Sequence, residues 1–144
     1  MKTFRGKLED HTQHRIHLSG GNPDFGYRIV KFQVIGKNED TDYETAVQIF
    51  KSDPGGFGTA TANIDFDNDS LIAACLYNDS TSGGVEAAQI VVFDDEVVNQ
   101  DLFITMDGAQ TSGATINYHI VMEEVKMSDS EAAVVNYKAS LLHG

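Results

Sequence analysis

Apolar and polar residues alternate with a period of two along most of this chain, a pattern typical of β-strands with one face in the core and one in water. The clearest runs are Tyr27–Ile35, in which Val30, Phe32 and Val34 share one face, and Ile116–Met122. Turn-forming clusters such as Asn22-Pro23-Asp24 separate the runs. Shorter runs with the same alternation occur at 4–8, 16–18, 45–49 and 102–106.

The middle of the chain has a different pattern. Residues 57–70 are polar and rich in Gly, Ala and Thr, which predicts a long loop with one short strand at Asn63–Phe66. Leu71–Tyr77 is a continuous apolar run between acidic and Asn-containing turns, which favours a fully buried strand. Residues 85–93 end in Ile90-Val91-Val92-Phe93 and are interpreted as a further strand.

About eight strands at short, regular spacing predict an all-β fold of two packed sheets. We expect a jelly-roll-like sandwich, with an immunoglobulin-like sandwich as the alternative. Residues 1–127 would form this single domain, and residues 128–144 a C-terminal α-helix. A chain of 144 residues is long enough to bury a core without disulfides or metals.

The expected helix has a clear start. Ser128 and Glu131 have the spacing of a capping box, and Asp129 adds negative charge at the positive end of the helix dipole. Its apolar stripe consists of Ala132, Val135, Ala139 and Leu142. A helix of roughly 14 residues is marginal alone in water, so the stripe must be covered. The cover is either the chain's own sandwich or a neighbouring subunit.

The charge restricts the choice of partner. The chain carries 10 Lys and Arg against 22 Asp and Glu, for a net charge of −12. Nucleic acid and anionic membrane surfaces require clustered positive charge, so neither is expected as a partner. Residues 1–7 are basic but lead into no apolar run, so we expect no secretory signal peptide and synthesis in a cytoplasm. No run approaches the ~20 apolar residues of a membrane span.

Cys75 is the single cysteine and lies inside the apolar run 71–77. One thiol forms no intrachain disulfide, and this setting is that of a buried small hydrophobe.

Two patterns resemble metal sites. Asp65, Asp67 and Asp69 have the first three spacings of a calcium loop, but Ser70 and Leu76 stand where an EF-hand needs Gly and Glu. A solvated acidic turn is the alternative, and we expect no cofactor apart from this possible calcium. His11, His14 and His17 would share a face only on a helix. Their flanking residues predict strand, so we expect no zinc site.

No catalytic motif stands out. The sequence contains no Gly-x-Ser-x-Gly elbow, His-Glu-x-x-His pair or phosphate-binding glycine loop. Tryptophan, a common sugar-stacking platform, is absent. We expect a protein that acts by contact and is not an enzyme.

The last third also resembles small virion proteins of marine tailed phages. The shared features are a strand with Asn99-Gln100-Asp101, a strand with Asn117-Tyr118, and a helix that begins Glu131-Ala132. The resemblance implies a non-enzymatic capsid decoration or cement protein on the outer particle surface. It implies self-association or binding to the major capsid protein as the partner interaction, and it implies no catalytic residues. A lectin-like sandwich that binds carbohydrate or calcium is the alternative.

Overall fold

The computed structural model describes residues 1–18, 24–37, 43–54, 63–79, 87–108 and 115–128, together with Glu131, Val134 and Val135. The described residues form eight strands and are predominantly β, as the alternation predicted. The strands are β1 (Lys2–Glu9), β2 (Thr12–Ile16), β3 (Phe25–Gly36), β4 (Tyr43–Phe50), β5 (Leu71–Asp79), β6 (Ala87–Val92), β7 (Leu102–Asp107) and β8 (Thr115–Lys126).

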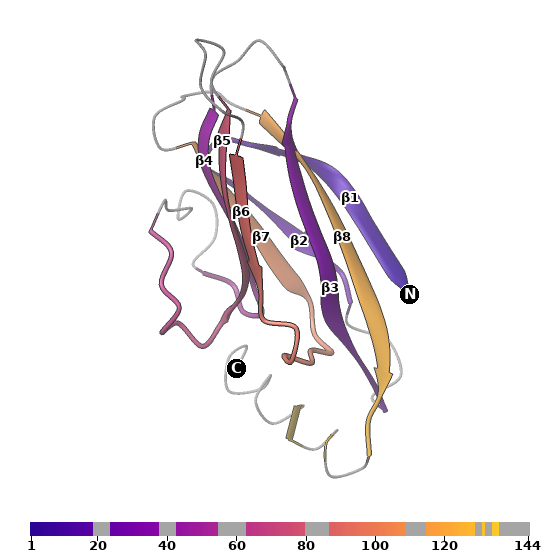
Figure 1. Ribbon diagram of the computed structural model, residues 1–144. Helices are drawn as coiled ribbons and strands as arrows, with labels where there is room; N and C mark the ends of the chain where they lie inside the picture. Colours follow the sequence, from indigo (N-terminus) through magenta and orange to yellow (C-terminus); the bar gives the residue numbers. More distant parts are fainter. Residues whose placement is uncertain are drawn as a thin grey trace.

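The strands form two antiparallel sheets that face each other (Figure 1). One sheet has three strands in the order β1-β8-β3, and the other has five in the order β2-β7-β4-β5-β6. β8 lies in the middle of the smaller sheet, where it pairs with β1 along one edge and β3 along the other. The sequence expectation of a two-sheet sandwich is therefore confirmed.

The strand pairing is that of a jelly roll. The first strand pairs with the last, β2 pairs with β7, and β4 pairs with β5. In this nested order the first strand pairs with the last and the second with the second last, so β3 and β6 are the remaining pair. They lie in different sheets but contact each other along one side of the sandwich. An immunoglobulin-like sandwich would place the first two strands side by side in one sheet. Here β1 and β2 belong to different sheets, joined by the turn at residues 10–11.

The core lies between the sheets and follows the alternation in the sequence. In β8, residues 116, 118, 120 and 122 are buried and their neighbours are half-buried. Ile116, Ile120 and Met122 have no measurable exposure and meet Leu8, Ile49 and Ile104 from other strands. A bulge between Ile29 and Lys31 shifts the register of β3 against β8. The shift keeps Ile29 and Phe32 both in the core despite their odd spacing.

β7 differs from the expectation of one face in water. All six of its residues are buried, including Phe103 and Thr105 on the outer face. Phe103, Phe50, Leu71 and Ala74 form a second, smaller apolar cluster on that face, covered by Ile64 and Phe93. The five-stranded sheet thus carries an extra layer, visible in Figure 1 as the magenta segment 63–70 beside the sheet.

The short strand expected at Asn63–Phe66 is wrong. Residues 63–65 have no regular structure and Phe66 lies in a turn. The polar atoms of this segment form local and side-chain hydrogen bonds instead of a sheet ladder. Gln48 Nε2 donates to the Asn63 carbonyl at 3.1 Å, and the Asn68 N–H donates to the Asp65 carbonyl at 3.1 Å.

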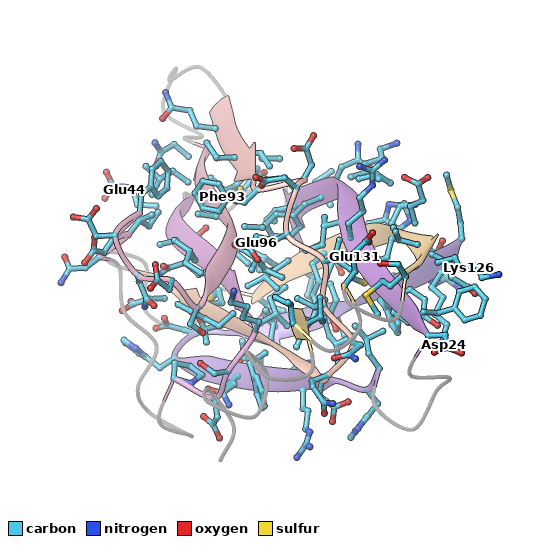
Figure 2. The ribbon with its side chains drawn as sticks, turned by 90° about the horizontal axis from the view of Figure 1, so that it is seen from below. Asp24, Glu44, Phe93, Glu96, Lys126 and Glu131 are labelled. Atoms are coloured by element: carbon cyan, nitrogen blue, oxygen red, sulfur yellow. The ribbon has the colours of Figure 1, made fainter. Side chains whose placement is uncertain are left out.

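The predicted C-terminal helix is not seen as an element among the described residues. The Glu131 N–H donates to Ser128 Oγ at 3.3 Å, which is the N-cap hydrogen bond of a capping box. Glu131, Val134 and Val135 are helical. No complete helix occurs in the described part of the chain, and the rest of 128–144 lies outside it. Figure 2 views this end of the molecule, where Asp24 and Lys126 lie at the tips of β3 and β8.

Candidate functional site

The outer face of the three-stranded sheet is the most extensive polar surface that the register defines. Because side chains alternate across a strand, every second residue of β1, β8 and β3 lies on this face. We call this set the basic face: Thr3, Arg5, Lys7 and Glu9 of β1, Thr115, Asn117, His119, Val121 and Glu123 of β8, and Arg28, Lys31, Gln33 and Ile35 of β3. Ile35 is 60% exposed and is an apolar contact point within it.

The basic face has the opposite charge balance to the whole chain. It holds four Lys or Arg residues and two acids, whereas the chain has 10 Lys and Arg against 22 acids. Arg28 and Glu123 pair across β3 and β8, with Nη2 and Oε2 2.6 Å apart. Arg5, Lys7 and Lys31 are exposed and form no ion pair with any other described residue. The face therefore presents positive charge that no described residue pairs with, on a strongly acidic protein.

The outer face of the other sheet is buried at its centre, along β4 and β7. Gln48 and Thr105 point to that face, yet each is only 2% exposed. Their neighbours Phe50 and Phe103 belong to the covered second cluster. The β5–β6 edge of that face is exposed, with Leu76 42% and Val91 40% accessible, so the basic face is the charged one of two accessible outer surfaces.

Asp101 anchors one end of β2 to β7. Its side chain is 3% exposed, and Oδ1 accepts the Leu18 N–H at 2.8 Å. Oδ2 accepts from Arg15 Nε at 2.6 Å and lies 3.4 Å from His17 Nδ1. A buried carboxylate with this many donors is a structural anchor and needs no ligand to explain it.

Asp10, His11 and Asp107 form a group with metal-ligand geometry. One ligand atom of each lies within 4.8 Å of the others, the one such group in the described ranges. Asp10 and His11 form the turn between β1 and β2, and Asp107 ends β7. His14 and His17, which the sequence spacing associates with His11, lie elsewhere: His14 is exposed on β2, and His17 contacts Asp101.

Asp65, Asp67 and Asp69 lie on an exposed turn before β5. Asp65 Oδ1 accepts the Asp67 N–H at 2.9 Å, and Asn68 Oδ1 accepts the Ser70 N–H at 2.9 Å. These are Asx turns, in which a side chain stabilises the backbone of the following residues. The three carboxylates are not a group with ligand atoms within 4.8 Å of one another. Calcium binding at this turn stays a prediction.

Cys75 is fully buried in β5. Burial raises the pKa of its thiol to about 12, because the thiolate would lose its hydration. A thiol that stays protonated at neutral pH is a poor nucleophile and metal ligand. Cys75 therefore serves the core, as its apolar sequence context indicated.

The expected contact stripe of the C-terminal helix is only partly described. Val135 is half-buried, whereas Ala132, Ala139 and Leu142 lie outside the described residues. The neighbouring Val134 is 53% exposed. The role of the stripe in binding stays a prediction.

Sequence reasoning did not find the basic face or the Asp10 group. Arg5, Lys7 and Lys31 are ordinary strand residues in the sequence, and they share a face only because β8 lies between β1 and β3. Asp10 and Asp107 are 97 positions apart and meet because Thr12 pairs with Met106. The turn between β1 and β2 also lacks the usual glycine or asparagine, because His11 occupies the position with positive φ.

Comparison with known proteins gives one partial likeness. The chain is 31% identical over 77 residues to a glucan 1,3-beta-glucosidase of Cochliobolus carbonum. The alignment covers 54% of this chain and 10% of the glucosidase, so the chain matches about a tenth of that enzyme's length. No family model matches the chain. No solved structure matches it.

Among the described residues, no helix has the length and apolarity needed to cross a membrane.

Proposed function

We propose that this chain is a non-enzymatic structural protein of a phage particle, most specifically a capsid decoration protein. The observation that carries the proposal is the basic face, an exposed sheet surface on which Arg5, Lys7 and Lys31 pair with no other described residue, on a protein of net charge −12. Such a chain repels its copies in most orientations and attracts an acidic surface in one. Decoration of a repetitive lattice requires this kind of single, oriented contact.

The fold and the sequence resemblance support the same proposal. A jelly roll is an architecture of viral capsid proteins as well as of lectins. The resemblance to virion proteins of marine tailed phages lies in residues 99–134, which include β7 and β8. β8 is the central strand of the sheet that bears the basic face. The partners under this proposal are the major capsid protein and neighbouring copies of the chain on the outer particle surface.

The direct test is the protein inventory of purified particles by mass spectrometry. A decoration protein is expected in many copies per particle, in a fixed ratio to the major capsid protein. Treatment of the particles with high salt should release it, since the proposed contact is electrostatic. Its absence from particles whose genome encodes it would contradict the proposal.

A carbohydrate-binding module is the second candidate, and the partial likeness to a glucosidase favours it. The chain would then bind a glucan without cleaving it, as a jelly-roll lectin domain does. A glycan array probed with the purified protein, with and without a chelator, separates the two candidates. Binding to β-1,3-glucan would support the second, and an array without signal would exclude it for the glycans tested.

A further inference from the structure

The turn that carries the chain from one sheet to the other brings together three potential metal ligands. β1 belongs to the three-stranded sheet and β2 to the five-stranded sheet, and Asp10 and His11 are the two residues between them. β2 pairs with β7 from Thr12 and Met106 onward, which places Asp107 beside the turn. The Gly108 N–H donates to Asp10 Oδ1 at 2.7 Å and fixes the end of β7 to the turn.

The three side chains converge, with one ligand atom of each within 4.8 Å of the others. His11 Nε2 lies 3.7 Å from Asp10 Oδ2, and His11 Nδ1 lies 3.8 Å from Asp107 Oδ1. These separations are too long for hydrogen bonds. The two contacts use different nitrogens of the ring, and an ion is ligated by only one of them. Two ligands each about 2.0–2.2 Å from a zinc ion lie roughly 3–3.6 Å apart, so the side chains must turn for both carboxylates to share the ion with the same nitrogen.

Two of the three potential ligands are nearly buried. The side chains of Asp10 and Asp107 are only 9% and 12% exposed, whereas the His11 side chain is 59% exposed. A bound cation would offset the repulsion between two neighbouring carboxylates. The Gly108 N–H satisfies Oδ1 of Asp10, and Oδ2 is the oxygen that faces His11. This resembles the hydrogen bonding that orients carboxylate ligands in metal sites.

We propose that Asp10, His11 and Asp107 bind a divalent transition-metal ion, with Zn²⁺ as the representative. An imidazole nitrogen with two carboxylate oxygens suits zinc and its neighbours, whereas calcium and magnesium prefer oxygen ligands alone. The exposed side of His11 leaves the remaining coordination positions to water or to a ligand from a partner. The ion ties the β1–β2 turn to the end of β7 and so links the two sheets. This inference is independent of the proposed function.

The test is Zn²⁺ titration of the full chain by calorimetry, using protein purified without a histidine tag and treated with a chelator. One equivalent should bind, and the melting temperature should rise by about 5–10 °C when free Zn²⁺ exceeds Kd a hundredfold. Substitution of Co²⁺ for Zn²⁺ adds a visible absorption band that reports nitrogen and oxygen ligation.

Matched variants locate the site. His11→Gly removes the imidazole and suits the φ of 57° at this position, so the turn remains formed. Asp107→Asn keeps the shape of the side chain and removes its charge. Each should weaken Zn²⁺ binding by about 100-fold or more. Two control substitutions should leave binding unchanged. They are His14→Ala, at an exposed position of β2, and Asp67→Asn, in the exposed acidic turn.

Two results would overturn the inference. The first is a wild-type chain that binds neither Zn²⁺ nor Co²⁺ and whose melting temperature does not respond to them. The three side chains would then only lie near one another in the turn, which requires no metal. The second is metal binding that survives His11→Gly and Asp107→Asn but is lost in His14→Ala. Circular dichroism of each variant confirms that a loss of binding is not a loss of fold.

Discussion

Cys75 shows how a single buried residue sets a property of the whole chain. Its side chain lies between the sheets, where no water hydrates a thiolate, so its pKa rises from the ordinary value of 9.0 to about 12. Burial also raises the pKa of Tyr118 in the neighbouring sheet. Both groups are neutral when protonated, so the folded state holds protons that the unfolded state releases at alkaline pH.

The first prediction is a loss of stability above pH 9. Between about pH 9 and 12 the unfolded chain binds fewer protons than the folded chain, so the free energy of unfolding falls as pH rises. Urea unfolding at pH 7, 9 and 10.5 measures the decline. Cys75→Ala should lower stability at pH 7 and make the decline shallower. An equal decline in wild type and Cys75→Ala would contradict the assignment.

Gly6 is required by the aromatic ring opposite it. Gly6 pairs with Tyr118 across β1 and β8, and a Cβ at Gly6 would lie 2.8 Å from Tyr118 Oη and 3.0 Å from Cζ. The second prediction is that Gly6→Ala destabilises the fold by about 1–2 kcal/mol, because the ring must leave its packed position. Thermal or urea unfolding measures the change.

A double-mutant cycle tests this explanation of Gly6. Tyr118→Phe removes Oη, the atom nearest to the added methyl group, so Gly6→Ala should cost less in the Tyr118→Phe background. The coupling energy is the difference between the loss of unfolding free energy that Gly6→Ala causes in the wild type and the loss that it causes in Tyr118→Phe. Additive effects of the two substitutions would show that the ring is not the obstacle.

At the scale of elements, Asp101 holds the end of β2 against β7. The third prediction is that Asp101→Ala destabilises the fold by about 2–3 kcal/mol, because the buried Leu18 N–H loses its acceptor and Arg15 its partner. Denaturant unfolding measures the loss. Asp53→Ala is the control, since Asp53 also accepts from a β2 side chain, Gln13, but is exposed. The control should change stability by less than about 0.5 kcal/mol.

The strands themselves were predictable because their alternation is strong. Tyr27–Ile35 and Ile116–Met122 lie within β3 and β8, and β8 buries the expected residues. In β3 the expectation is wrong for Val30, which is 40% exposed because the bulge places Ile29 in the core in its stead. β7 was not fully predictable, since Phe103 and Thr105 are buried by a layer outside the sheet. That layer comes from residues 63–70, whose polar sequence indicates a loop but not what the loop covers. The apolar residues Ile64 and Phe66 were the available signal.

The candidate sites depend on the whole topology, which alternation does not specify. A jelly roll and an immunoglobulin-like sandwich can be built from the same list of strands. Only the nested pairing places β8 between β1 and β3, and so gathers Arg5, Lys7 and Lys31 on one face. The same pairing brings Asp107 to the β1–β2 turn. The composition alone indicates an acidic protein. The excess of positive charge on one face can be recognised only once the strand register is known.

At the scale of the molecule, the last prediction concerns charge substitutions on the basic face. Arg5→Glu, Lys7→Glu and Lys31→Glu each should weaken rebinding of the purified protein to particles that lack it, by about tenfold at low salt, since a contact charge is replaced by a repelling one. Lys126→Glu is the matched control, because it changes net charge equally at an exposed position outside the basic face. Rebinding is measured by co-sedimentation at several salt concentrations.

The comparison of these variants separates a local contact from a general effect of charge. If total charge alone governed binding, all four substitutions would weaken it equally, and salt would remove the differences among them. A larger loss at Arg5, Lys7 and Lys31, with melting temperatures unchanged, assigns the contact to the outer face of the three-stranded sheet. Equal losses at Lys126 would contradict that assignment and would show that net charge, and not a contact on this face, governs binding.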